Sequence, residues 1–321
     1  MKIASLPKAD LLQYDQLARE CGTIFNSVKW ISLFGNRIQP VGIYNDNDEL
    51  IGGFHFYTEN KLGLTICRDA PSTPHCGPFL KTAAKNPVAI MDNWKKAISL
   101  MSGYIESLHM PLISISLDKP IVDTLPFIWK KYKVTPRYTY LIDLTLSLDT
   151  ILKNMSPERR NDIRKGEKNG VKVGITTDYR TVQSLVSQSF SRQNMSLDHS
   201  HIAAILFGFA DGDNSFAFVA EDGHHPIAAA FCVYDSHTAY YLLGGYDHEN
   251  KHRSAGPLVC LEAIKHARQL GLKVFDFEGS MVPAIESYFR SFGGSLTPYY
   301  RINKAMLPIE MILKFFKREF F

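Results

Sequence analysis

Two side chains near the C-terminus have the chemical types and the surroundings needed for proton transfer. Glu278 follows the apolar run Val274–Phe277, where we expect a strand to end, and precedes Gly279. Partial burial there would raise the pKa of the Glu278 carboxyl toward neutrality, which suits a general base or a group that orients an amine. Tyr288 is the candidate acid. The alternatives, that Glu278 caps the next helix and that Tyr288 fills the core, stay open.

A glycine-containing strand end and a basic loop upstream form a candidate anion site. The loop leads into a helix that we expect to start near Pro257. Free N–H groups of the first turn, the helix dipole and one guanidinium would together attract negative charge. The alternative is an ordinary helix entrance, and Asp247 in the same stretch is a weaker candidate base. The residues assigned to this site are Gly244, Gly245, Arg253, Ser254, Ala255 and Gly256.

A basic helix supplies a third group of candidate residues. Ser156 and Pro157 are typical of a helix start, and Gly170 is typical of a helix end. Within this helix, positions i, i+4 and i+8 share one face. Guanidinium groups on that face would match phosphate oxygens, whereas the alternative is a solvated charged face. The residues are Arg160, Arg164 and Lys168.

Other kinds of site find little support in the sequence. The histidines at 224, 225, 237, 248 and 252 lie in expected loops and turns without an Asp, Glu or Cys ligand set, so we expect no metal. Neither a Gly-x-Ser-x-Gly elbow nor a Walker-type loop is present. The formal net charge of +4 on 321 residues is too small to indicate DNA as the main ligand.

Composition and segment patterns also bear on location. The N-terminal residues lack the apolar core of a signal peptide, and no run approaches the roughly 18 apolar residues that would span a bilayer. We therefore expect a cytoplasmic protein. The five cysteines are widely spaced; Cys67 and Cys76 could pair, but idle thiols are the simpler interpretation.

The elements that must position these residues occur in an order that repeats. In the second half we expect a strand, two helices, three antiparallel strands, a helix, a strand, a short helix and a strand. The stretch Thr135-Pro136 after one helix end is echoed by Thr297-Pro298 after another. The sequence therefore predicts a duplication, with domains 1–145 and 146–321 and a cleft between them.

The loop Arg253-Ser254-Ala255-Gly256 and the stretch from Asp276 to Tyr288 resemble those of GNAT acyltransferases. With the duplication and the basic helix Arg159–Lys165, the chain resembles the FemAB-like acyltransferases, including the FemA/FemB/FemX type. The resemblance implies an α+β fold of two tandem GNAT-like domains, with mixed central sheets flanked by helices and a degenerate donor loop in the first. Leu258 replaces the small residue that usually ends the GNAT loop.

The resemblance implies transfer of an acyl or aminoacyl group to an amine of a small or envelope-precursor acceptor. Acyl-CoA, or else aminoacyl-tRNA, would be the donor, held at Arg253–Gly256. Glu278 and Tyr288 would transfer protons, and Arg160, Arg164 and Lys168 would bind acceptor phosphates. The coiled-coil arm of some peptidoglycan members is missing, which disfavours tRNA. The rival hypothesis is a non-catalytic binding protein of duplicated GNAT fold that recognises an envelope precursor or a partner.

The C-terminal segment predicts one more helix, at 309–321. Its apolar residues alternate with Lys314, Lys317 and Arg318. Such a helix can lie on an anionic membrane surface, which would make the protein peripheral to the inner face of the membrane, or it can pack over the second domain. The sequence leaves both alternatives open.

Overall fold

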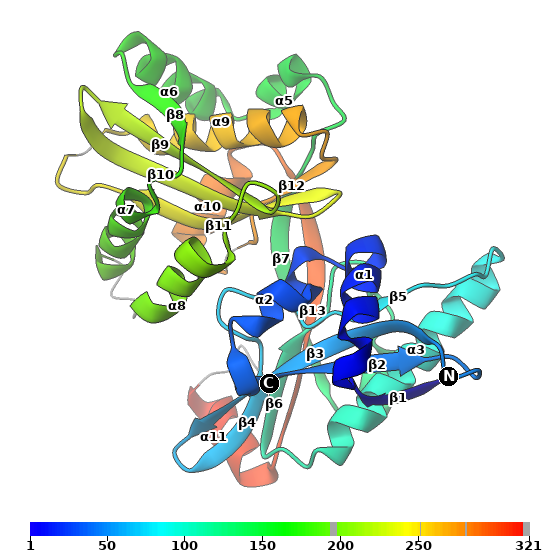
Figure 1. Ribbon diagram of the computed structural model, residues 1–321. Helices are drawn as coiled ribbons and strands as arrows, with labels where there is room; N and C mark the ends of the chain where they lie inside the picture. Colours follow the sequence, from blue (N-terminus) through cyan, green and yellow to red (C-terminus); the bar gives the residue numbers. More distant parts are fainter. Residues whose placement is uncertain (193–197, 251, 280, 317–321) are drawn as a thin grey trace. The chain divides into compact units, whose positions relative to one another are not determined.

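The computed structural model describes residues 1–192, 198–250, 252–279 and 281–316 (Figure 1). The chain forms two compact units. The first unit consists of Met1–Arg137 together with Pro298–Phe321, and the second consists of Tyr138–Thr297. The sequence-based halves, 1–145 and 146–321, describe the repeat along the chain and stay a prediction.

The first unit opens with a strand and two helices, and an antiparallel meander follows. Helix α3 begins after Asn86, whose side chain caps it by accepting hydrogen bonds from the N–H groups of Val88 and Ala89. The elements are β1 (Lys2–Ser5), α1 (Leu11–Cys21), α2 (Val28–Ser32), β2 (Ile38–Tyr44), β3 (Leu50–Lys61), β4 (Leu64–Arg68), β5 (Phe79–Leu80), α3 (Pro87–Ser107), β6 (Leu112–Ser116), α4 (Leu125–Trp129) and, after the second unit, α11 (Leu307–Phe316).

The sheet of the first unit has the strand order β1-β2-β3-β4-β6-β13, where β13 is Ser295–Ala305. Its pairs are antiparallel except β4 with β6, which run parallel for only two residue pairs, Cys67↔Ile113 and Arg68↔Ser114. Beyond these pairs the two strands diverge. Apolar side chains of β3, β6 and α3 form the core, and its fully buried members include Phe54, Phe56, Met101, Ile105 and Ile115.

The loop at 69–78 fills the space where β4 and β6 diverge. The Cys76 N–H donates to the Ser116 carbonyl at 3.0 Å, and the His55 N–H donates to the Cys76 carbonyl at 3.0 Å. On the same segment the Asp118 N–H donates to the Gly77 carbonyl at 3.1 Å. These bonds insert the loop between β3 and β6 as an irregular extra strand, so the chain itself closes the gap.

The second unit repeats the order of the first, as the sequence predicts. Helix α6 begins at the predicted cap, where Ser156 Oγ accepts from the Arg159 N–H. Helix α5 was not expected. The elements are β7 (Lys133–Asp143), α5 (Leu148–Asn154), α6 (Pro157–Lys168), β8 (Lys172–Thr176), α7 (Tyr179–Arg192), α8 (His199–Ala203) continued by a π-helix (Ala204–Phe209), β9 (Ser215–Asp222), β10 (His225–Tyr234), β11 (Thr238–Tyr246), α9 (Ala255–Gln269), β12 (Val274–Asp276) and α10 (Pro283–Arg290). Strand β13 follows along the chain and lies mainly in the first unit.

The sheet of the second unit has the order β7-β12-β11-β10-β9-β8. Figure 1 shows α6 and α9 over one face of this sheet and α7 and α8 over the other. The face under α9 holds the larger core, and its buried members include Phe218, Ile264, Phe275, Phe277 and Phe292. The predicted α+β fold, with mixed sheets flanked by helices, is confirmed.

The two repeats exchange their last strands. Strand β7, which ends the first repeat, pairs with β12 in the second unit through Asp143↔Val274, Ile142↔Phe275 and Leu141↔Asp276. Strand β13, which ends the second repeat, pairs with β6 in the first unit, from Arg301↔Ser116 to Ala305↔Leu112. Each sheet is therefore completed by a strand from the other repeat.

Two further expectations can be compared with the structure. Among the residues that the structure describes, no helix combines the length and the apolar character needed to cross a membrane. All five cysteines are free, and Cys67 and Cys76 are both buried. The simpler interpretation of these cysteines, as unpaired thiols, is confirmed.

Candidate active site

The candidate site lies where the parallel strands β11 and β12 separate. They pair through only three residue pairs, from Thr238↔Val274 to Tyr240↔Asp276. Strand β12 then ends, while β11 continues to Tyr246. Sites in α/β sheets commonly form at the carboxyl ends of strands, because backbone groups and loops converge there.

A strained turn follows the end of β12 at Glu278. Glu278 has φ +60° and Gly279 has φ +65°, and the left-handed region is uncommon for a residue with a side chain. A Cβ on Gly279 would lie 2.1 Å from the Tyr138 carbonyl oxygen, so only glycine fits there. The Glu278 N–H donates to Asp276 Oδ1 at 2.8 Å, and Thr139 Oγ1 donates to the same oxygen at 2.5 Å. Strain of this kind often accompanies function, because packing must hold it in place.

Tyr288 extends from α10 toward the first turn of α9. Its Oη lies 3.3 Å from the position that a Cβ on Gly256 would take. The guanidinium of Arg159 lies 4.5 Å from the Tyr288 ring centroid, and Tyr288 also packs edge-on against Phe292. Burial raises the pKa of the Tyr288 phenol well above its usual range. The phenol is therefore protonated at neutral pH and can act as a proton donor.

A second phenol, which sequence reasoning did not single out, accompanies Tyr288. Tyr241 lies on β11, and its Oη is 2.5 Å from the position of a Cβ on Gly244. Burial first, and then the neighbouring Tyr288, raise the pKa of the Tyr241 phenol. Gly244 thus leaves room for this phenol. In the sequence, the only signal for this role of Tyr241 is its position three residues before Gly244.

Gly245 serves helix packing. A Cβ there would lie 2.7 Å from Leu185 Cβ and 2.8 Å from the Val186 nitrogen, so the absence of a side chain lets α7 approach β11. Beside it, the Tyr246 N–H donates to Ser189 Oγ at 2.8 Å. In this structure, Gly245 lies in β11 against a helix.

Arg253 is engaged by two carboxylates of α6. Its guanidinium bonds to Glu158, and its Nε lies 3.2 Å from Asp162 Oδ1. The Arg253 side chain is nevertheless 72% exposed, so this pairing contributes about 0–1 kcal/mol. The charge predicted for a donor phosphate is thus partly neutralised by the protein itself.

Helix α9 begins at Ala255, two residues before the predicted start. Ser254 occupies the cap position and is buried, but its side chain makes no capping hydrogen bond. A Cβ on Gly166 would lie 2.3 Å from Leu258 Cδ1 and 2.8 Å from Ser254 Cβ, so α6 packs closely on the first turn of α9. Part of this helix start is therefore covered.

The three predicted phosphate ligands on α6 do not act alike. Arg160 Nη1 donates to the carbonyls of Met155 at 2.6 Å and Lys153 at 2.9 Å, so it closes the end of α5. Arg164 and Lys168 are exposed. The neighbour that sequence reasoning left aside, Arg159, is the one that reaches the candidate site.

Asp247 and the histidines belong to a loop structure. Asp247 accepts from His225 Nε2 at 2.8 Å, from Asn250 Nδ2 at 3.0 Å and from the Glu249 N–H at 2.8 Å. Hydrogen bonds from Asn250 and His225 lower the pKa of its carboxyl far below the usual range. Asp247 is therefore a poor base. Among the described residues, no group of three or more His, Cys, Asp or Glu side chains could hold a metal ion.

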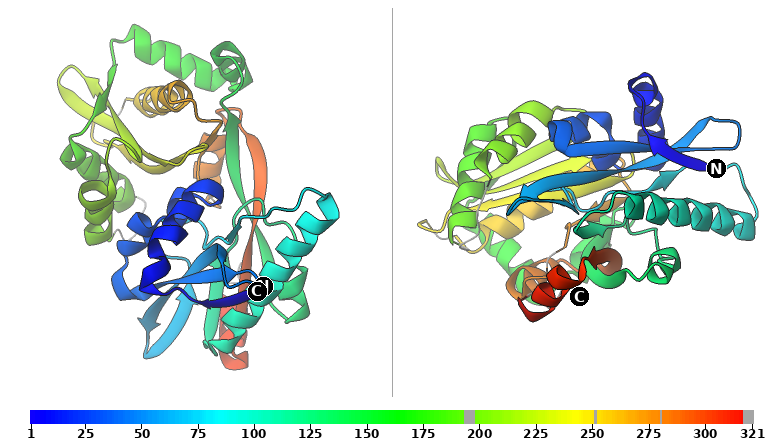
Figure 2. Two further views of the ribbon diagram at one scale, coloured as in Figure 1. Left: turned by 45° about the vertical axis from the view of Figure 1, so that its right-hand side comes forward. Right: turned by 90° about the horizontal axis from the view of Figure 1, so that it is seen from below.

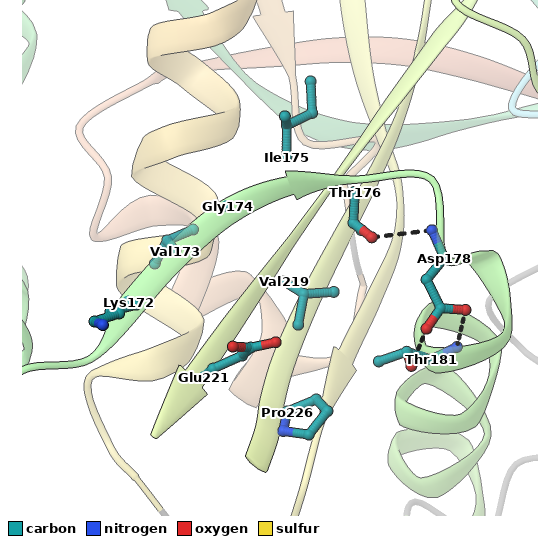
Figure 3. Close-up of a pocket in the computed structure, with 10 residues that line it drawn as sticks. All are labelled: Lys172, Val173, Gly174, Ile175, Thr176, Asp178, Thr181, Val219, Glu221 and Pro226. Atoms are coloured by element: carbon teal, nitrogen blue, oxygen red, sulfur yellow. Dashed lines mark hydrogen bonds between the residues drawn. The ribbon is translucent and has the colours of Figure 1, made fainter. Parts of the chain in front are cut away.

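One cavity of about 410 Å³ lies elsewhere in the second unit (Figure 3). Residues of β8, β9 and the start of α7 line it, including Lys172, Glu221 and Asp178. Figure 3 shows the hydrogen bonds that join Asp178 to Thr176 and Thr181 at one end. None of the predicted site residues lines this cavity.

Comparison with known proteins identifies the fold. Residues 157–290 match the model of an acetyltransferase (GNAT) domain, so the match contains β11, α9, β12 and Tyr288. Over the whole chain, the crystal structure of FemX is similar with a TM-score of 0.68 and 13% identity, covering 98% of this chain and 100% of that one. The chain has the FemX fold. The predicted resemblance to FemAB-like acyltransferases is confirmed at the level of the fold.

Two further solved structures share this fold. One is the C-terminal domain of an Agrobacterium fabrum protein named as a lysylphosphatidylglycerol synthetase, with a TM-score of 0.61, 10% identity and 95% of both chains covered. The other is L-PGS from Bacillus licheniformis, with a TM-score of 0.55, 12% identity and 96% of both chains covered. No curated protein matches the sequence. The GNAT match and the FemX fold support acyl transfer as the general class of reaction.

Proposed function

We propose that this chain is an N-acyltransferase that moves an acyl or aminoacyl group to an amine, with the second unit as the catalytic half. One observation carries the proposal: Tyr288 Oη approaches the first turn of α9 at Gly256, 3.3 Å from the Cβ position, beside the separating strands β11 and β12. The GNAT match contains all of these elements.

The proposed reaction needs two proton transfers. The nitrogen of the acceptor attacks the carbonyl carbon of the donor, and Glu278 takes the proton that the nitrogen loses as the N–C bond forms. When the tetrahedral intermediate collapses, the C–S or C–O bond breaks, and Tyr288 gives its proton to the departing atom. Free N–H groups at the start of α9 would stabilise negative charge on the donor. Positioning supplies much of the remaining acceleration.

The character of the Tyr288 acid favours an ester donor over a thioester. Burial raises the pKa of the Tyr288 phenol, which makes it a reluctant proton donor. A thiol has a pKa of about 8.5, so a thiolate leaves without much help, whereas an alkoxide is far more basic and needs a proton. The pairing of Arg253 with Glu158 and Asp162 points the same way, because an acyl-CoA pyrophosphate would have to compete with two carboxylates.

The acceptor is proposed to carry phosphate. Arg164 and Lys168 are exposed on α6, where they are available to an anionic group. Arg160 is expected to contribute little, because its guanidinium already bonds to the carbonyls of Met155 and Lys153.

A transfer assay with two donors tests the proposal. The protein would be mixed with acetyl-CoA or with aminoacyl-tRNA and a panel of primary amines, and amide products would be measured by mass spectrometry. We expect product with at least one donor, and calorimetry should detect binding of that donor. Absence of binding and of product with both donors at millimolar CoA or micromolar tRNA would contradict the proposal.

The second candidate is the non-catalytic binding protein. The close packing of Gly166 on Ser254 and the engagement of Arg253 favour it, because both reduce access to the start of α9. This function predicts binding of an envelope precursor without consumption of either donor.

A further inference from the structure

Helix α11 of the first unit carries an apolar surface that faces away from the protein. No described residue of this helix is buried. At about 100° per residue, the exposed side chains cover roughly half of the helix circumference. The half-buried Ile309 and Leu313 lie on the opposite side. The exposed apolar residues are Leu307 (71%), Met311 (65%), Ile312 (58%), Phe315 (75%) and Phe316 (75%).

A second apolar projection lies at the same end of the first unit. The turn between β3 and β4 holds Leu62, which is 97% exposed with φ +52°, and Leu64, which is 45% exposed. Figure 1 and the left view of Figure 2 place this turn and α11 at the lower end of the unit, although they are far apart in the sequence. Two separate convex projections suit a flat apolar layer better than a protein groove.

The sequence of these two segments carries a small positive excess. Residues 304–321 contain Lys304, Lys314, Lys317 and Arg318 against Glu310 and Glu319. Glu310 is paired with Lys314 at 2.6 Å, and Lys304 with Glu106 at 2.6 Å, so these pairs add no net charge. The positive excess of the segment comes from Lys317 and Arg318 over Glu319 in the sequence. Lys61 directly precedes Leu62 in the turn. Basic residues beside an exposed apolar stripe match the negative surface of a membrane leaflet.

We propose that α11 and the turn Lys61–Leu64 together bind the surface of a bilayer that contains anionic lipids. Phe315, Phe316 and Leu62 would enter the boundary between headgroups and acyl chains, while the basic side chains stay among the headgroups. The inference concerns the location of the protein and does not depend on the proposed transfer reaction.

Vesicle co-sedimentation of the full chain tests this inference. Vesicles of phosphatidylcholine mixed with phosphatidylglycerol, which carries a negative charge, would be compared with pure phosphatidylcholine. We expect binding to the mixed vesicles that falls in high salt. Phe315→Ser with Phe316→Ser should weaken it at least tenfold, and Leu62→Ser should weaken it severalfold.

Phe207→Ser is the matched control, because Phe207 is also exposed (53%) but lies on the second unit. It should bind vesicles like the unchanged chain. Circular dichroism would establish that each variant is folded. The proposal is overturned if anionic vesicles do not bind the chain, if the double variant binds them unchanged, or if the exposed stripe instead mediates self-association that Phe315→Ser with Phe316→Ser abolishes.

Discussion

In each unit a pair of parallel strands separates, but the region between the separating strands differs between the two units. In the first unit, β4 and β6 diverge and the loop at 69–78 fills the gap, with the Cys76 N–H bonded to the Ser116 carbonyl. In the second unit, β11 runs past the end of β12, and the chain turns away through the strained Glu278 and Gly279. In the first repeat a loop fills the region between the strands. In the second repeat the polar side chain of Glu278 lies on the turn that follows β12.

The carboxylates near the separating strands, Asp69 in the first unit and Glu278 in the second, also differ in their surroundings. In the first unit Asp69 is partly buried and accepts from the Ser116 N–H at 2.7 Å, from Ser116 Oγ at 2.7 Å and from Arg301 Nη2 at 3.0 Å. In the second unit Glu278 stands on a turn with unfavourable backbone dihedrals. We infer that the first set stabilises the fold and the second set serves the reaction. Variants of each set should therefore separate stability from activity.

The largest effect is expected for the second unit. Glu278→Gln should lower the rate of transfer about 10²–10⁴-fold, because it removes the proposed base without changing the size of the side chain. Tyr288→Phe should lower the rate less for a thioester than for an ester donor. Single-turnover kinetics would measure both rates.

Two exposed or distant residues provide controls for this experiment. Glu262→Gln removes a carboxylate of α9 that pairs with Lys265, and Tyr179→Phe removes a phenol on α7. Both should keep the full rate. If Glu278→Gln transferred as fast as the unchanged chain, Glu278 would have no part in catalysis.

Removal of the partly buried Asp69 carboxylate of the first unit should affect stability alone. Asp69→Ala removes the acceptor of the Ser116 N–H, the Ser116 hydroxyl and one Arg301 N–H, and such a loss costs about 1–3 kcal/mol. Urea denaturation would measure the free energy of unfolding, and the rate per folded molecule should stay unchanged. Asp92→Ala, on the exposed surface of α3, should cost less than about 0.5 kcal/mol. If Asp69→Ala lost activity without losing stability, the inference that Asp69 serves only the stability of the fold would be wrong.

Acid should destabilise the first unit through His55. Burial, and then the nearby His75, lower the pKa of His55 to about 3. An unfolded chain binds a proton there near pH 6.5, whereas the folded chain does not until about pH 3, so stability falls as the pH falls between these values. The contribution is about 1.4 kcal/mol per pH unit in this window.

His55→Gln should therefore make the free energy of unfolding less dependent on pH. Urea denaturation at several values between pH 6.5 and pH 4 would measure the slope, which should fall by about one proton. His224→Gln, an exposed position of the second unit, should leave the slope unchanged. An unchanged slope in His55→Gln would mean that His55 is not the buried neutral group described here.

The smallest effect concerns the start of α9. Glu158→Gln should free part of the Arg253 charge and raise the affinity for CoA about two- to fivefold, because an exposed pair contributes less than about 1 kcal/mol. Calorimetry would measure the dissociation constant. Glu167→Gln changes an exposed carboxylate of the same helix and should have no effect. A lower affinity in Glu158→Gln would show that Glu158 supports this loop rather than competing with a phosphate.

Local signals made much of the fold predictable. Ser156 caps the helix that its type and position predicted, and the sequence also indicated the three antiparallel strands β9 to β11. A cap works through N–H groups two or three residues away, so its signal is contained in the sequence nearby. The strand before Glu278 and the helix after it were likewise predictable from the residues nearby.

The features that the sequence did not predict depend on contacts between residues far apart in the chain. The bond from Arg253 to Glu158 joins residues 95 positions apart, and nothing near either residue indicates it. The insertion of Cys76 beside Ser116 depends on backbone groups, which every residue has, so side-chain patterns do not reveal it. The stacking of Arg159 on Tyr288 likewise required the packed structure.

The exchange of β7 and β13 has a consequence for synthesis of the chain on the ribosome. The sheet of the first unit lacks the strand beside β6 until residues 301–305 have been made. Nascent chains of every shorter length would therefore present an open sheet edge, to which chaperones or neighbouring chains could add a strand. The strand that completes the first sheet is thus made only after residues 138–297 of the second unit.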